Sequence, residues 1–193
     1  MRILIIHNSY RVYGGEDSVV SSEIAMLKKY GNDVFYYSED SKKINGVFNT
    51  INVALNLNYS KKSKKKFDKV LASVKPDVVH AHNLFPIWTN SIFDACSKHK
   101  IPIVQTFHNY RFTCAASNLY RAGTVCEKCI SGNPFNGLLH KCYKNSYVAS
   151  FFVSKMINYD KKNKTYEKKV NKIIALTEFA KQKYIEAGLP ETQ

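Results

Sequence analysis

His7, His82 and His108 each come directly after a short run of residues that predicts a buried strand. An imidazole titrates near physiological pH, so it can act as an acid or a base on a bound ligand. A single histidine at a strand end most often has a structural role, but the carboxyl ends of parallel strands meet at one edge of a sheet. We therefore expect these three side chains, with the adjacent Asn8 and Asn83, to line one ligand cleft.

Two consecutive glycines, Gly14 and Gly15, stand directly before a predicted helix. Glycines let backbone N–H groups approach a ligand closely, and the positive end of the helix favours an anion such as phosphate. The segment 10–15 lacks the G-x-G-x-x-G spacing of dinucleotide-binding sites. The pattern predicts a phosphate-binding loop of another kind, unless the glycines serve only to turn a strand into a helix.

Four of the five cysteines form the pattern Cys114-x11-Cys126-x2-Cys129-x12-Cys142. A C-x2-C pair on a turn, with two outer cysteines, matches the ligands of a tetrahedral structural zinc site. The outer spacing differs from that of a zinc ribbon, and His140 could replace either outer ligand. The alternatives are reduced, packed thiols and disulfides, and a redox role is disfavoured because the pair does not open a helix. The four cysteines are therefore candidate zinc ligands.

These residues need a scaffold, and the apolar pattern predicts one in which strands and helices alternate. Strands are expected at 3–6, 33–38, 78–81, 101–107 and 172–176. Helices are expected at 16–30, 61–74 and 147–159, together with a short helix capped by Thr89 and a helix capped by Thr177 that stops at Gly188. The helix residues expected to face the core are Val20, Ile24, Leu27, Phe67, Val70, Leu71, Val74, Ile92, Phe93 and Cys96. Such alternation gives a parallel sheet with right-handed crossovers.

The expected fold class is α/β, a Rossmann-like parallel sheet with flanking helices and a small cysteine-rich insertion at 110–145. The chain has 193 residues, 45% of them hydrophobic, which suits one α/β core and predicts a single domain over 1–193. Its apolar runs stay below 18 residues, and its start is typical of a core strand rather than a signal peptide. These features predict a cytoplasmic protein, in which disulfides are uncommon.

Four segments of the chain resemble motifs of the family 4 glycosyltransferases, which have the GT-B fold. The first, 14–20 with Glu23, Leu27 and 31–34, is similar to the family motif GGED…E…L…GHEV. The second, 76–83, is similar to PDVVHxHN, and the third, 106–111, to THD(Y/F)R. The fourth, 174–177, is similar to a family strand that ends in serine or threonine. Asn32 and Asn109 depart from the family's histidine and aspartate. The second departure removes a carboxylate that could have acted as a base beside His108.

The resemblance implies an enzyme of two Rossmann-like domains, of which the N-terminal one binds the acceptor. The C-terminal domain of such enzymes holds a nucleotide sugar through a basic residue and an E-x7-E pair, and a second set of strands that could form this domain is not found in these 193 residues. The chain is therefore expected to be the acceptor-side half of a retaining glycosyltransferase. It would be inactive without the donor-binding domain, and catalysis would need no cofactor.

The resemblance also implies roles for individual residues. Gly14 and Gly15 would approach the donor diphosphate and stabilise leaving-group charge, and His108 would hydrogen-bond the sugar or assist proton movement. The acceptor cleft is expected to be lined by His7, Asn8, His82, Asn83, Asn109, Tyr110, Arg111 and Thr177. The expected partners are a nucleotide-sugar donor and a glycan or lipid-linked acceptor.

Most of the net charge of +14 lies in two lysine-rich segments, 61–75 with +6 and 141–172 with +7. Lysine rather than arginine indicates diffuse attraction to an anionic surface, or simply a solvated face. The apolar segment 47–57 precedes the first cluster, and apolar residues at 151–156 lie in the second. Unless these residues are buried, they suit a peripheral contact with an anionic membrane, where enzymes of this family often meet lipid-linked acceptors.

A non-enzymatic binding module with a zinc knuckle is the alternative function. The pI near 9.5 and the 13 tyrosines would suit nucleic acid, but the lysines are not interleaved with aromatic residues in a known motif. Nucleic acid is therefore not the expected partner. A stand-alone small-molecule enzyme that uses the three histidines is a third reading.

Overall fold

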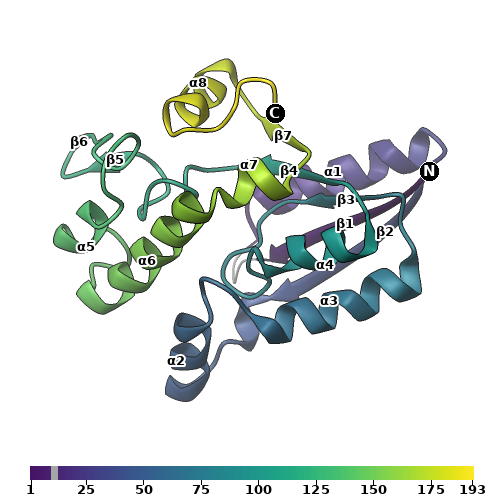
Figure 1. Ribbon diagram of the computed structural model, residues 1–193, viewed down its shortest axis with the longest axis horizontal. Helices are drawn as coiled ribbons and strands as arrows, with labels where there is room; N and C mark the ends of the chain where they lie inside the picture. The colour runs from purple at the N-terminus through teal and green to yellow at the C-terminus, as the bar shows by residue number, and fades with distance from the viewer. Residues whose placement is uncertain (10–12) are drawn as a thin grey trace. The chain divides into compact units, whose positions relative to one another are not determined.

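The computed structural model describes residues 1–9 and 13–193, apart from the side chain of residue 43. The chain divides into two compact units (Figure 1). Unit 1 comprises 1–108 and 169–174, and unit 2 comprises 109–168 and 175–193. The insertion expected at 110–145 lies in unit 2, which also takes in the helical segments on either side of 169–174.

Unit 1 is built on a five-stranded sheet in the order β2-β1-β3-β4-β7. The strands are β1 (Arg2–Ser9), β2 (Asp33–Asp40), β3 (Val78–Ala81), β4 (Ile103–Phe107) and β7 (Lys172–Ala175). The pairs β1–β2, β1–β3 and β3–β4 are parallel. Residues 3–6 of β1 are all buried, as expected of a strand covered on both faces. The α/β fold class with a parallel sheet is confirmed.

Helices cover the sheet on both sides, and Figure 1 shows α1 (Gly15–Lys29) on one side and the pair α3 (Lys61–Val74) and α4 (Ser91–His99) on the other. Val20 of α1 packs with Ile3 and Ile5 of β1, and Ile24 and Leu27 extend this contact. Between β2 and α3 lie a short 3-10 turn, η1 (Ser41–Lys43), and α2 (Val47–Leu55). The side-chain faces expected for these helices are therefore correct, with Ile24, Leu27 and Val74 half-buried rather than buried.

Several boundaries differ from the sequence expectation: β1 continues past residue 6 to Ser9, β2 past residue 38 to Asp40 and α6 past residue 159 to Asn163. Two other differences have clear local reasons. The strand expected from residue 101 begins at Ile103, because Pro102 has no N–H, although its carbonyl accepts a hydrogen bond from the Val79 N–H at 3.0 Å. The Thr89 cap is wrong: α4 begins at Ser91, and Thr89 has a positive φ of 53°. The Thr89 hydroxyl instead accepts hydrogen bonds from two backbone N–H groups, so it stabilises the turn before the helix.

Unit 2 has short strands and several helices. Its elements are β5 (Tyr120–Arg121), β6 (Thr124–Val125), α5 (Asn136–Leu139), α6 (Tyr147–Asn163), α7 (Thr165–Lys169), whose last residue belongs to unit 1, and α8 (Glu178–Glu186). Thr177 caps α8 as predicted, accepting a hydrogen bond from the Ala180 N–H at 3.0 Å. Gly137 brings α5 close to α6, because a Cβ there would lie 2.9 Å from the Ser154 hydroxyl.

Among the described residues, the helices are too short or too polar to cross a membrane.

Candidate functional site

The predicted histidines of unit 1 meet at the carboxyl edge of the sheet, where β1, β3 and β4 end. His7 is fully buried and His82 is 1% exposed, whereas His108, the residue after β4, is half-buried. The His82 and His108 rings are stacked with centroids 5.2 Å apart, and His82 Nδ1 lies 2.9 Å from His108 Nε2. His108 is therefore the member of this group through which the buried histidines can reach a ligand.

Acidic residues of α1 hold the buried histidines from the helix side. Glu23 Oε1 lies 2.6 Å from His80 Nδ1, and the other ring nitrogen of His80 lies 2.7 Å from the Thr106 hydroxyl. Asp17 Oδ1 lies 3.2 Å from His7 Nε2. Glu23, His80 and Asp17 were not predicted as site residues. Glu23 and Asp17 stand out in the sequence only as part of the motif along α1, and nothing there indicates which histidine each one meets.

The histidine cluster favours neutral imidazoles. Burial, together with the positive charge that His80, His108 and His7 can carry, lowers the pKa of His82 to about 2. Burial also lowers the pKa of His108, although the carboxylates of Glu16 and Glu23 oppose this change. Both rings are therefore uncharged at neutral pH, and each has one nitrogen that donates and one that accepts hydrogen bonds.

Glu23, His80 and His82 could also hold a metal ion, since their ligand atoms lie within 4.8 Å of one another. A carboxylate and two imidazoles are suitable ligands for zinc. The distance of 2.6 Å between Glu23 Oε1 and His80 Nδ1 is that of a hydrogen bond, which an ion would have to replace. The arrangement shown is therefore a hydrogen-bonded network.

The predicted phosphate loop begins at residues outside the described ranges, because 10–12 are not described. The Gly14 N–H already donates to Asp17 Oδ2 at 2.9 Å. Gly15, the first residue of α1, is exposed, and there is open space where its Cβ would be. An anion at this helix end would therefore use the amides of the first turn rather than that of Gly14, and the phosphate contact stays a prediction.

Asn8 and Asn83 join the ends of β1 and β3. Asn8 is fully buried, its side-chain amide donates to the Leu84 carbonyl at 2.5 Å, and its backbone N–H donates to the Asn83 carbonyl at 2.6 Å. The Asn83 side chain donates in turn to the Asn8 carbonyl at 3.1 Å. These contacts fix the edge of the sheet on which the histidines lie, and they leave Asn83 as the more exposed of the two amides.

The family of this chain is established by its match to known sequences. The model of Glycosyltransferase Family 4 matches residues 29–193, a stretch that includes His80, His82 and His108. The chain belongs to glycosyltransferase family 4. This result confirms the resemblance to the N-terminal domain of family 4 enzymes, although Gly14 and Gly15 lie before the matched residues.

Two proteins similar to this chain are longer than it is. It is 25% identical over 130 residues to an "Uncharacterized 42.6 kDa protein in cps region" of Klebsiella pneumoniae, a match that covers 67% of the domain and 28% of the relative. It also resembles the solved UDP-GlcNAc 2-epimerase from Methanocaldococcus jannaschii, with a TM-score of 0.48 and 16% identity over 100% of the domain and 44% of the epimerase. The matched part is less than half the length of either protein.

Four further residues of the predicted cleft lie in unit 2, and most of their observed contacts stabilise that unit of the family 4 domain. The Arg111 guanidinium donates to the Ala115 carbonyl at 2.6 Å and to the Ser117 hydroxyl at 3.2 Å. The Asn109 side chain accepts from the Arg111 N–H at 3.0 Å. Tyr110 packs against Tyr184 of α8, and Thr177 caps that helix. Their place in an acceptor cleft stays a prediction.

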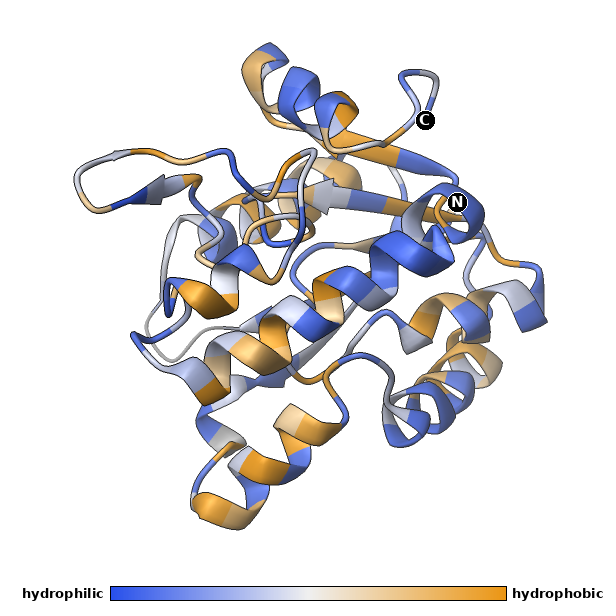
Figure 2. Cartoon of the chain, turned by 60° about the vertical axis from the view of Figure 1, so that its left-hand side comes forward, coloured by the Kyte–Doolittle hydropathy of each residue, from blue (hydrophilic) through white to orange (hydrophobic). Residues whose placement is uncertain are grey.

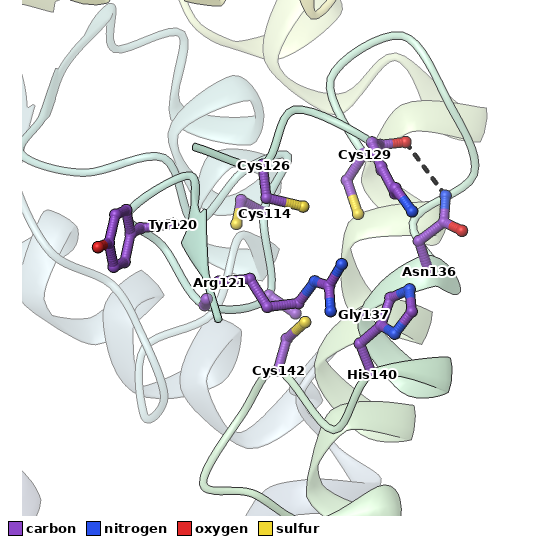
Figure 3. A pocket seen from close by; sticks show the side chains of 12 residues that line it. Cys114, Tyr120, Arg121, Cys126, Cys129, Asn136, Gly137, His140 and Cys142 are labelled. Carbon is purple, nitrogen blue, oxygen red and sulfur yellow. Dashed lines mark hydrogen bonds between the residues drawn. The ribbon is translucent and has the colours of Figure 1, made fainter. Parts of the chain in front are cut away.

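The four predicted zinc ligands of the family 4 domain line one small cavity in unit 2 (Figure 3). Cys114, Cys126, Cys129 and Cys142 all have free thiols. Burial raises the pKa of Cys129 to about 11 and also raises the pKa of Cys142. Cys126 differs: burial opposes its ionisation, but hydrogen bonds from the Lys128 N–H and the Arg121 guanidinium hold its pKa below the ordinary value.

Proposed function

We propose that this domain is the acceptor-binding half of a retaining glycosyltransferase, which moves a sugar from a nucleotide-sugar donor to a glycan or lipid-linked acceptor. Membership of family 4 supports the reaction class. The observation that carries the assignment of the site is the half-buried His108, which lies at the carboxyl edge of the sheet and is hydrogen-bonded to the buried His82. Ligands of parallel α/β sheets bind at this edge.

The surrounding charges favour one set of proton positions on the two rings. His82 Nε2 is buried without a hydrogen-bond partner among the described residues, and it lies 3.6 Å from Glu23 Oε2. A nearby carboxylate favours a proton on that nitrogen, so His82 Nδ1 is left as an acceptor for the His108 Nε2–H. The remaining nitrogen, Nδ1 of His108, then carries a lone pair that can accept a hydrogen bond from a sugar hydroxyl.

The first turn of α1 is the proposed contact for the donor diphosphate. The amides of this turn carry partial positive charge, which favours an anion at this end of the helix. Glu16 and Asp17 lie in the same turn, and Asp17 is engaged by His7 and Gly14. The contact would therefore be made by main-chain amides from Gly15 onward, and the remaining donor contacts would come from a second domain.

The donor-binding domain is proposed to lie outside these 193 residues. The share of the Klebsiella relative that is matched, 28%, supports a longer functional protein. The cps region in the name of that relative supports a role in polysaccharide biosynthesis. We propose that the 193-residue domain does not turn over by itself and that catalysis needs no cofactor.

Sugar transfer by the full-length protein tests this function. Incubated with labelled nucleotide sugars and a membrane extract as acceptor source, the full-length protein is expected to transfer one sugar, and the 193-residue domain none. The anomeric configuration of the product, measured by NMR, is expected to match that of the donor. Absence of transfer from every donor by the full-length protein would contradict the function, and an inverted product would contradict retention.

We also propose that the domain binds an anionic membrane surface through α2 and the start of α3. None of the α2 residues is buried, and Phe48 is 90% exposed, which is costly for an apolar side chain left in water. Figure 2 shows the apolar residues of α2 as orange segments at the bottom of the view. The exposed lysines Lys61, Lys62 and Lys65 follow directly on α3. Apolar insertion beside lysine charge is the pattern of interfacial helices.

Exchange of Phe48 for glutamate is expected to weaken co-sedimentation with anionic vesicles by at least about tenfold, because insertion of one aromatic ring contributes about 1.5–3 kcal/mol. Binding of the unmodified domain should fall as salt rises. Tyr30→Glu is the matched control, since Tyr30 is also exposed but lies at the end of α1. Equal binding to neutral vesicles, or equal losses in both variants, would refute the membrane contact.

A further inference from the structure

The cysteine-bearing part of unit 2 has little regular structure to hold it in place. Between residues 109 and 145 there are two strands of two residues each and one helix of four residues. Its small apolar cluster is centred on Cys114, Leu119 and Ile130. Short hairpins and small cores of this kind are not stable by themselves, and proteins reinforce them with disulfides or metal ions.

The four cysteines come from separate turns, yet all of them line the same cavity. Cys114 follows β4 in the chain, Cys126 follows β6, Cys129 lies in the next turn, and Cys142 follows α5. Figure 3 shows the four sulfur atoms along the walls of this cavity. They carry free thiols, so the convergence is not the product of disulfide bonds.

We propose that Cys114, Cys126, Cys129 and Cys142 bind a structural zinc ion as four thiolates. Zinc favours four ligands of this type in a closed tetrahedral site, and soft sulfur ligands exclude magnesium and calcium. The sulfur atoms line the walls rather than meeting at one point, so the ion would draw them inward. The inference concerns the folding of unit 2 and does not depend on the proposed sugar transfer.

Cationic groups around the cavity match the charge of this site. A zinc ion with four thiolates carries two negative charges, and Arg121 and Lys128 both line the cavity. Arg121 Nε is buried without a hydrogen-bond partner among the described residues, and thiolate sulfur would supply an acceptor. Hydrogen-bonding groups around the ligands commonly orient the ligands of a metal site and stabilise it.

The backbone around the ligands is also fixed by hydrogen bonds. Lys161 of α6 donates through Nζ to the carbonyls of Cys129 and Ile130, each at 2.8 Å. The Thr113 hydroxyl donates to the Cys129 carbonyl at 3.0 Å, and the Cys142 N–H donates to the Gly137 carbonyl at 2.9 Å. The turns that carry the cysteines therefore have a defined position before the ion is added.

Cys142 is favoured over His140 as the fourth ligand. Both line the cavity, but Cys142 is half-buried whereas His140 is exposed. Exchange of His140 for alanine is therefore expected to leave zinc content unchanged, and exchange of Cys142 for serine to abolish it. Loss of zinc from the first variant, with retention by the second, would overturn the four-thiolate assignment.

Metal analysis of the purified 193-residue protein tests the site. Protein prepared at neutral pH with a non-chelating reductant is expected to contain about one zinc per chain, and Cys129→Ser less than about 0.2. Cys96→Ser is the matched control and should keep its zinc, because Cys96 is fully buried in α4 of unit 1. Less than about 0.2 zinc per chain in the unmodified protein would overturn the proposal, as would equal zinc in both serine variants.

Cobalt replacement tests the ligands without any substitution. Protein from which zinc has been removed is expected to bind one cobalt ion with the intense thiolate-to-cobalt absorption of a tetrahedral four-sulfur site, and zinc should displace it. A strong chelator should lower the Tm of the unmodified protein and leave that of Cys129→Ser unchanged. Octahedral cobalt spectra, or a mass that shows disulfides among these cysteines in metal-free protein as isolated, would overturn the proposal.

Discussion

Replacement of His108 by alanine in the full-length enzyme is expected to lower kcat/KM by about 10²–10⁴, the range typical of a lost acid–base or hydrogen-bonding group. The substitution removes the nitrogen proposed to accept a hydrogen bond from the sugar. It also leaves the buried His82 without the partner that lies 2.9 Å away. Steady-state kinetics with the transferred nucleotide sugar measure the loss, and unchanged kcat/KM would remove His108 from the mechanism.

Two amide variants separate the functions of the His108 ring. Glutamine can reach the Nε2 position and keep the hydrogen bond to His82, whereas asparagine can place a polar atom near the Nδ1 position. If Nδ1 serves the sugar, His108→Asn should retain more activity than His108→Gln. His99→Ala provides the control, because His99 lies at the end of α4 and pairs with Asp68, and its kcat/KM should equal that of the unmodified enzyme.

The second large effect is a loss of stability in mild acid. The pKa of His82 is lowered from its ordinary value of 6.5 to about 2 in the folded protein, whereas the unfolded chain should titrate near 6.5. Between these values the unfolded chain binds more protons than the folded one, so the free energy of unfolding falls as the pH falls below about 6.5. For His82 alone the expected loss at about pH 5 is about 2 kcal/mol, and His108, whose pKa is also lowered, adds to it.

Urea unfolding at several pH values between about 7.5 and 5 measures this loss, in a range above the titration of most carboxylates. His82→Gln should be less stable at neutral pH but should show a smaller decline in acid. Ile92→Val is a suitable comparison, because it removes one methylene from a fully buried side chain and should cost about 0.5–1.5 kcal/mol at every pH. If the free energy of unfolding of His82→Gln falls with pH as steeply as that of Ile92→Val, His82 is not the source of the loss of stability in acid.

The two lysine-rich regions have different surroundings. On α3 the lysines follow a helix whose apolar residues are exposed, with Phe48 the most exposed of them. On α6 the apolar side chains are only partly available: Phe151 is 39% exposed and packs against Phe135 and Phe152. The first region is therefore the better candidate for a membrane contact, a distinction that charge counts along the sequence do not make.

The sequence by itself determined the fold class, the family and the position of most elements. An unbroken apolar run such as 3–6 keeps all its side chains out of water only if the strand is buried on both faces. The spacing of Phe67, Val70 and Leu71 predicts one buried face of α3. Local signals of this kind suffice because each element meets the sheet through its own periodic apolar residues. The same periodicity placed the histidines near the carboxyl ends of the strands, although β1 continues past His7 to Ser9.

Only the tertiary structure decided which polar groups meet there. Glu23 reaches His80 because α1 crosses back over the sheet, and His82 reaches His108 because β3 and β4 are neighbours. It also decided that the cysteines 114–142 share a cavity within a second compact unit. Such pairings depend on distances between residues far apart in the chain, and neither side-chain type nor local spacing predicts those distances.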